Sequence, residues 1–209
     1  MPQKEHKLIS VSGEGSVPAV PDQAAITLGT VTESKDPASA QKENNKSITD
    51  ILSALAAKGV KKENMKTIEY RVEPLYDYAE GKTVPAGYRV THMIRIITDD
   101  IEQSGELVDT AVQHGANAVA SVSFTLKNPE MYYNKAFTLA LLQTRSKAEA
   151  AAKTLRVSLN EKPVHVQELS QSPQPFSYQS AVFSKSPGAP IQQGELLISA
   201  SAKADYTYQ

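Results

Sequence analysis

The sequence contains no cysteine and no tryptophan among its 209 residues. Without cysteine the chain has no disulfide scaffold, no thiolate ligand for zinc or an iron-sulfur cluster, and no cysteine nucleophile or redox centre. This one absence excludes several classes of enzyme. A chain of this length nevertheless buries roughly 70% of its unfolded surface, so it forms a sizeable core without covalent crosslinks.

An excess of charge of either sign is also missing. The 22 Lys and Arg residues nearly balance the 23 Asp and Glu residues, which gives a formal net charge of -1. Binding to duplex DNA through a basic face requires clustered Lys and Arg, because the phosphates supply most of the attraction. We therefore predict no nucleic-acid partner.

Long apolar runs are absent as well. The first residues lead into a polar, strand-like segment without the apolar stretch of about 7 to 15 residues that marks a secretory signal. The longest apolar runs, 54–57 and 139–142, fall far short of the roughly 20 residues that span a membrane. We expect no transmembrane segment, and a cytoplasmic address if Met1 is the native start. A chain trimmed before Met1 is equally compatible with export.

Hydrophobic periodicity indicates the order of the elements. Periods of two predict strands and periods near 3.6 predict helices. The expected strands are 7–11, 23–31, 67–73, 88–96, 121–126, 164–166 and 196–205, and the expected helices are 37–58, 100–114 and 129–155. This order predicts an α+β fold, in which a largely antiparallel sheet built from hairpins carries the three helices on one face.

The whole chain, 1–209, is predicted to be a single domain. Residues 1–127 contain two strand-helix-strand halves, and residues 128–209 contain the long helix, a further segment and the C-terminal strand. That segment, 170–194, is rich in Ser, Gln and Pro and buries little apolar surface, so we expect it to be mobile.

Capping residues support the helix limits. Asp36 and Asn128 are each followed by a proline, which is favoured at the first helical position. Gly59 and Gly115 follow the apolar stripes of the first two helices and are expected to terminate them.

Glycine and proline are also concentrated between the first two expected strands. Gly13 and Gly15, with Pro18 and Pro21, predict a turn that joins 7–11 to 23–31 as a hairpin. The pair resembles the start of a dinucleotide fingerprint, but Pro18 stands where the third glycine belongs. A structural turn is therefore the better interpretation.

Residues for catalysis or metal binding form no recognisable set. The four histidines, His6, His92, His114 and His165, are scattered without metal-ligand spacing. His92 lies on an apolar strand face, and we interpret it as a hydrogen-bonded core or interface residue rather than a ligand or base. No nucleophile elbow is present. We predict no catalytic, cofactor-binding or metal-binding residue.

Two surfaces are candidates for contact with another molecule. Tyrosines gather around the second expected hairpin, and Tyr76, Tyr78 and Tyr88 are the candidate interface residues there. They could instead stack nucleobases, but the carboxylates on the same hairpin disfavour a phosphate partner. Ala136 and Ala140 on the long helix form a second candidate interface, since small residues allow close approach.

The order and spacing of several motifs resemble the SIMPL family, a family of unknown function also called DUF541. The resemblance covers nearly the whole chain. It rests on Val11-Ser12-Gly13-Glu14-Gly15, Pro21-Asp22, Gly59 with Thr67 and Pro74, Leu107-Val108-Asp109, Gly115-Ala116-Asn117, the alanine-rich helix 136–152 and the strand after Gly194. Two departures are expected to matter. Many members carry an export signal that is absent here, and where members show a Leu-Gly pair after the long helix this chain has Leu155-Arg156-Val157 and Leu159-Asn160.

The resemblance implies a bacterial α+β protein that assembles into homo-oligomers, with a role in defence against oxidative stress and no known catalytic residues. Its fold-determining positions here are Gly13, Glu14, Gly15, Pro21, Asp22, Gly59 and Gly115. Our first hypothesis is a non-enzymatic, self-assembling protein with a stress-protective role. The alternative is a small-ligand binding module, its ligand unknown, with 170–194 as a lid; an enzyme is the third hypothesis.

Overall fold

The computed structural model describes residues 7–79, 81–169 and 194–209. They form two compact units. The first unit contains residues 7–21, 126–169 and 194–209, and the second contains 22–79 and 81–125. The predicted mobile segment 170–194 lies outside the described residues except for residue 194. None of the described helices combines the length and apolar character that crossing a bilayer requires.

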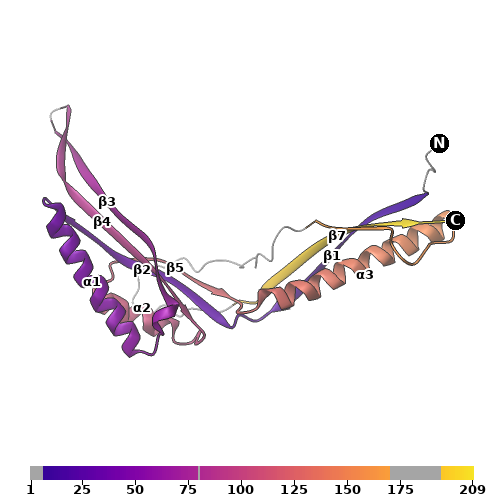
Figure 1. The fold of residues 1–209 in the computed structure, drawn as a ribbon, viewed down its shortest axis with the longest axis horizontal. Coiled ribbons are helices and arrows are strands. Elements are labelled where there is room, and N and C mark those ends of the chain that lie inside the picture. Colours follow the sequence, from indigo (N-terminus) through magenta and orange to yellow (C-terminus); the bar gives the residue numbers. More distant parts are fainter. Residues whose placement is uncertain (1–6, 80, 170–193) are drawn as a thin grey trace. The chain divides into compact units, whose positions relative to one another are not determined.

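The second unit is a four-stranded antiparallel sheet with two helices on one face (Figure 1). Its strands are β2 (Gln23–Ser34), β3 (Met65–Ala79), β4 (Lys82–Thr98) and β5 (Ala118–Thr125), in the order β3-β4-β2-β5. The helices are α1 (Pro37–Ala57) and α2 (Ser104–Gln113), and a short 3-10 helix, η1 (Lys62–Asn64), precedes β3. β3 and β5 are the edge strands, so each pairs with another strand of this sheet on one side only.

Large aliphatic side chains fill the space between this sheet and its helices. Seven of them are at most 1% exposed: Ile26, Leu28, Ile51, Leu55, Ile94, Ile96 and Leu107. Side chains alternate between the faces of a strand. The even-numbered residues of β4 therefore face the helices, and the odd-numbered residues face the open side of the sheet.

The first unit is a long two-stranded ribbon covered by one helix. Its elements are β1 (Leu8–Ala19), α3 (Pro129–Leu155), β6 (His165–Glu168) and β7 (Leu196–Thr207). β1 and β7 pair antiparallel over twelve residues, from Leu8 opposite Thr207 to Ala19 opposite Leu196, and β6 adds a short third strand beside β7. The first and last described strands therefore belong to one sheet.

Gly13 and Gly15 lie inside β1, where α3 approaches closely. A Cβ atom at Gly13 would lie 2.2 Å from the carbonyl oxygen of Ala140, and one at Gly15 would lie 2.1 Å from that of Ala136. The predicted hairpin between 7–11 and 23–31 is wrong, because β1 continues through both glycines and pairs with β7. These glycines permit contact between a strand and a helix rather than a turn.

From Ala136 onward the buried face of α3 follows a spacing of four residues. It consists of Tyr133, Ala136, Ala140, Thr144, Ala148 and Ala152. Residues four apart form a ridge inclined by about 26° to the helix axis. The sheet thus contacts a tilted line of small residues, and Phe137 and Leu141 of the predicted stripe lie beside it, only partly buried.

The α+β class, the antiparallel pairing and the three helices are confirmed. The strands, expected in one sheet, form two, with α1 and α2 on one and α3 on the other. α2 begins at Ser104 instead of residue 100, and a turn precedes it in which the Asp100 side chain accepts a hydrogen bond from the Gln103 amide (3.2 Å). The single domain over 1–209 stays a prediction.

Candidate functional site

The hairpin formed by β3 and β4 extends beyond the rest of its sheet (Figure 1). The pairing of β2 with β4 ends where Ser34 lies opposite Tyr88, whereas β3 and β4 continue to Ala79 opposite Lys82. Residues 75–79 and 82–87 therefore form a two-stranded ribbon without a third strand, which we call the projecting ribbon. Such a ribbon gains little stability by itself in water.

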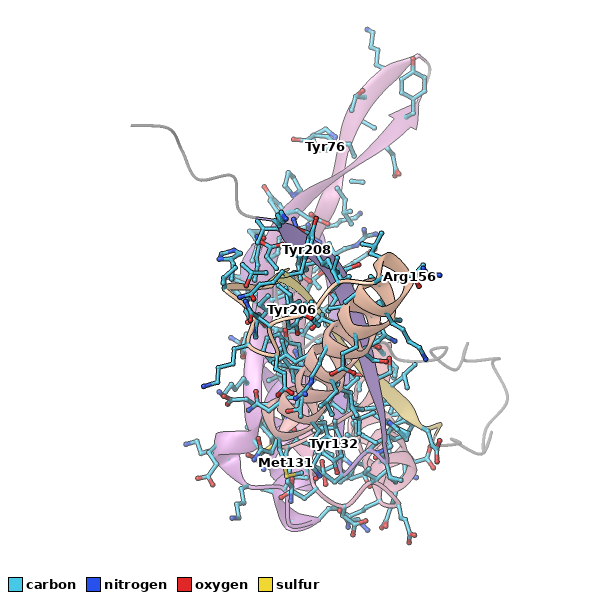
Figure 2. The ribbon with its side chains drawn as sticks, turned by 90° about the vertical axis from the view of Figure 1, so that its right-hand side faces the viewer. Tyr76, Met131, Tyr132, Arg156, Tyr206 and Tyr208 are labelled. Atoms are coloured by element: carbon cyan, nitrogen blue, oxygen red, sulfur yellow. The ribbon has the colours of Figure 1, made fainter. Side chains whose placement is uncertain are left out.

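One face of β3 carries a line of exposed apolar and aromatic side chains. We call this line the β3 stripe; it consists of Tyr70, Val72, Pro74, Tyr76 and Tyr78. Tyr76 is 60% exposed and Tyr78 is 78% exposed, and Tyr76 is labelled on the hairpin in Figure 2. Large exposed apolar surface of this kind is typical of a contact site for another molecule.

Local backbone features set the path of the ribbon. Gly81, in the turn, has a φ of +79°, which favours glycine. Gly87, at the base, has a φ of +148°, and a Cβ atom there would lie 2.8 Å from the Ser34 carbonyl oxygen. The register shifts between Leu75 and Tyr76, and an irregularity of this kind increases the local twist.

The open face of the same sheet carries a network of ion pairs. Arg71 contacts Glu69 at 3.0 Å and Glu73 at 3.4 Å. Arg89 contacts Glu33 at 2.7 Å and Glu73 at 3.9 Å. These groups are substantially exposed, so each pair contributes little to stability. On this part of the face, each arginine therefore lies beside carboxylates that balance its charge.

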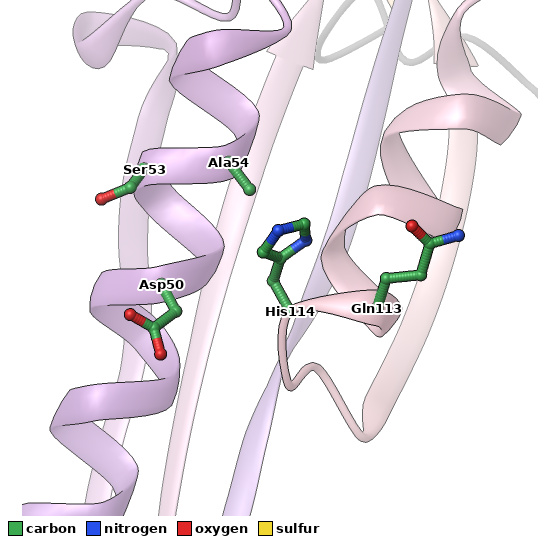
Figure 3. A pocket seen from close by; sticks show the side chains of 5 residues that line it. All are labelled: Asp50, Ser53, Ala54, Gln113 and His114. Atoms are coloured by element: carbon green, nitrogen blue, oxygen red, sulfur yellow. The ribbon is translucent and has the colours of Figure 1, made fainter.

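A shallow hollow of about 440 Å3 lies between α1 and α2, lined by Asp50, Ser53, Ala54, Gln113 and His114 (Figure 3). His114 Nδ1 lies 2.8 Å from the Thr110 carbonyl oxygen, which can only accept, so Nδ1 is the donor. The Ser53 hydroxyl donates to the Thr49 carbonyl oxygen at 2.8 Å. Within the described chain no hydrogen bond joins Ser53 to His114, as nucleophilic catalysis would require.

His92 lies deeper in the second unit, on the helix-facing side of β4. Its Nε2 is 3.0 Å from the Thr67 hydroxyl, and its ring packs edge-on against Tyr70 at 5.2 Å between centroids. Burial lowers the pKa of His92, because the charged imidazolium is poorly solvated there. No described group of three or more His, Asp or Glu side chains could hold a metal ion.

Comparison with known proteins gives the family. The model of SIMPL, a protein family of unknown function (DUF541), matches residues 9–206. The chain belongs to the SIMPL family. It is 31% identical over 133 residues to the uncharacterized protein YggE of Escherichia coli K12, a match that covers 64% of this chain and 54% of that relative. It thus spans about half the length of that relative.

Other SIMPL relatives match over more of the chain. The 26 kDa periplasmic immunogenic protein of Brucella melitensis is 27% identical over 173 residues, which are 80% of this chain and 69% of that protein. YggE of Edwardsiella ictaluri is 27% identical over 187 residues, 87% of this chain and 77% of that protein. The family's descriptions assign no activity.

The candidate interface residues of this SIMPL chain have separate places in the fold. Tyr76 and Tyr78 lie on the projecting ribbon, and Tyr88 lies at its base, partly buried. Ala136 and Ala140 are fully buried against β1, so β1 already occupies the small-residue face that was expected to meet a partner. Of these five residues, Tyr76 and Tyr78 are the exposed ones.

The expected fold-determining residues also lie apart. Gly59 and Gly115 follow α1 and α2 with φ of +89° and +107°, as helix-ending glycines do. Asp22 begins the second unit and its amide donates to the Thr125 carbonyl oxygen at 3.1 Å. The Glu14 amide donates to the Gln143 side chain at 2.8 Å, which ties the outer edge of β1 to α3.

The sequence interpretation missed Asn44, a fully buried amide on α1. Its Nδ2 lies 3.2 Å from the Thr30 carbonyl oxygen and 3.1 Å from that of Val90. It therefore fixes the helix over two neighbouring strands. A polar residue in the apolar stripe of 37–58, four residues after Ala40, was the available signal.

Proposed function

We propose that this SIMPL protein is a non-enzymatic, self-associating protein whose contact surface is the projecting ribbon with its β3 stripe. The observation that carries the proposal is the exposure of Tyr76 and Tyr78, at 60% and 78%, on a two-stranded extension. A ribbon with so little support gains stability when its apolar face is covered.

The edge position of β3 supports a second copy of the chain as the partner. An edge strand has backbone groups that can pair with another strand. In an antiparallel pair of two β3 strands centred on Val72, Arg71 of one copy lies opposite Glu73 of the other, and Tyr70 lies opposite Pro74. A twofold interface requires such self-complementarity.

The stress-protective role implied by the family resemblance is compatible with this proposal, but the sequence limits the chemistry by which such protection could act. The chain has no thiol, so protection against oxidants must act through assembly, binding or the oxidation of Met and Tyr side chains. The cytoplasmic address also stays a prediction, to be tested by cell fractionation, because the Brucella relative is named as periplasmic.

The experiment compares the wild type with the double variant Tyr76→Ser/Tyr78→Ser by size-exclusion chromatography with light scattering. We expect the wild type to elute at a multiple of 22.6 kDa at micromolar concentration. The variant is expected to shift toward the monomer, because burying one aromatic side chain contributes about 1.5 to 3 kcal/mol.

Leu142→Ser is the matched control, since Leu142 on α3 is 59% exposed but lies outside the ribbon. It should leave the mass unchanged. A wild type that is monomeric throughout, or a loss of mass in the control as large as in the double variant, would overturn the proposal.

A further inference from the structure

A second hollow lies at the opposite end of β3 from the tyrosines, on the open face of the sheet. Its volume is about 420 Å3, within the range of small-molecule sites. Ile68 and Ile97 supply its apolar wall, Lys66 and Arg95 two cations, and Glu63 and Asn64 the remaining polar groups. It therefore combines an apolar body with an excess of positive charge.

The two cations lie directly opposite each other. Lys66 of β3 pairs in register with Arg95 of β4, and like charges in that position destabilise a sheet. Neither side chain forms an ion pair with any residue that the structure describes. Arg71 and Arg89 on the same face each contact two carboxylates. Lys66 and Arg95 thus lack the ion pairs that Arg71 and Arg89 form on this face.

The apolar wall depends on a local irregularity in β3. The register with β4 shifts between Thr67 and Glu69, so Ile68 is the extra residue of a bulge. Bulges redirect side chains and are frequent beside binding sites. Ile68 remains 52% exposed, and Ile97 beside it is partly buried. An exposed isoleucine beside two unpaired cations provides distinct places for the two ends of one ligand.

We propose that this hollow binds a small monocarboxylate with an aliphatic body. The carboxylate lies between Lys66 and Arg95, where the guanidinium can donate two parallel hydrogen bonds. The aliphatic body packs on Ile68 and Ile97. The Glu63 carboxylate repels a second negative charge, which favours a monoanion over a phosphate or a dicarboxylate.

The test is a titration of the full chain with octanoate, followed by isothermal calorimetry and by amide shifts in two-dimensional NMR. We expect saturable binding with shifts centred on Lys66, Ile68 and Arg95. Butanoate, which lacks the longer body, and octan-1-ol, which lacks the charge, should each bind about tenfold more weakly. Equal affinity for octanoate and octan-1-ol, or shifts spread over both units, would overturn the proposal.

Charge-removing variants locate the site. Arg95→Gln and Lys66→Gln each replace an exposed side chain, and each should weaken octanoate binding about tenfold because a charge-assisted hydrogen bond is lost. Arg89→Gln is the matched control on the same face and should leave the affinity unchanged. Equal affinity in all three variants would contradict the proposal. The titration is repeated in Tyr76→Ser/Tyr78→Ser, in which self-association is expected to be lost. Saturable octanoate binding in that variant supports the hollow whether or not the proposed interface is correct, and its absence there would overturn the ligand proposal alone.

Discussion

In the second unit, large aliphatic side chains fill the space between the sheet and the helices α1 and α2. In the first unit, glycines on β1 and alanines on α3 let the backbones of the strand and the helix approach each other closely. Leu55 and Ile94 are typical of the former and are at most 1% exposed. Gly13 and Gly15 against Ala136 and Ala140 represent the latter. The first unit is therefore sensitive to a single added carbon where its helix lies on its strand. In the second unit the comparable close approach is between two strands, where a Cβ atom at Gly29 would lie 2.0 Å from the His92 carbonyl oxygen.

Gly15→Ala is expected to have the largest effect on stability and tests the close packing of α3 on β1. The new Cβ would meet the Ala136 carbonyl oxygen at 2.1 Å, and backbone atoms cannot turn aside as a side chain can. We expect a loss of about 1 to 3 kcal/mol in the free energy of unfolding of the first unit. Urea unfolding followed by circular dichroism measures the loss, and hydrogen exchange locates it in β1 and α3.

Gly105→Ala is its control in the second unit, because the added methyl group meets nothing within 4 Å. It lies in α2, where alanine is favoured over glycine by up to about 1 kcal/mol. A first unit that is equally stable with and without the Gly15 substitution would show that α3 shifts freely. The contrast between the units would then fail.

Arg156→Gly is expected to stabilise the first unit. Arg156 ends α3 with a φ of 54°, in the left-handed region where glycine is favoured. Arginine thus adopts here a conformation that glycine adopts without steric cost. We expect a gain of roughly 0.5 to 1 kcal/mol by thermal unfolding.

Lys153→Gly, one turn earlier in the same helix, is expected to have the opposite effect on stability. It should cost about 1 kcal/mol, because the backbone there is helical. A loss of stability in Arg156→Gly comparable to that in Lys153→Gly would contradict the interpretation of Arg156.

The smallest expected effect is a pH dependence confined to the second unit. Burial lowers the pKa of His92 below its unfolded value of 6.5. As the pH falls through 6.5, the unfolded chain therefore binds a proton at His92 more readily than the folded chain does. Stability is therefore full above that pH and declines as the pH falls through it. His92→Gln should flatten urea midpoints measured between pH 7.5 and 5. An equally steep decline in the variant would assign the acid sensitivity to other groups.

Local patterns predicted the helices because their determinants are close in sequence. Asp36 accepts a hydrogen bond from the Ser39 amide at 2.8 Å, and Pro37 and Pro129 begin α1 and α3. The pairing of β1 with β7 could not be seen in this way. The Ser10 hydroxyl donates to Asp205 at 2.6 Å across a separation of 195 residues, and no local rule connects such positions.

The candidate sites divide in the same manner. Composition alone drew attention to Tyr76 and Tyr78, but their exposure follows from β2 ending at Ser34 while β3 and β4 continue. The opposition of Lys66 and Arg95 depends on the register of two strands and on the bulge at Ile68. Alternation of Gly13 and Gly15 on one strand face, together with an alanine-rich helix, was an available signal for close packing in the first unit.

Hydrogen exchange of the full chain at several protein concentrations tests the central claim, self-association through the projecting ribbon, most directly. The account predicts that amides of 70–79 and 82–88 exchange more slowly as the concentration rises, because a second chain covers β3. Amides of β1 and α3 in the first unit should keep the same rates. Exchange in the ribbon that is fast and independent of concentration would contradict the account.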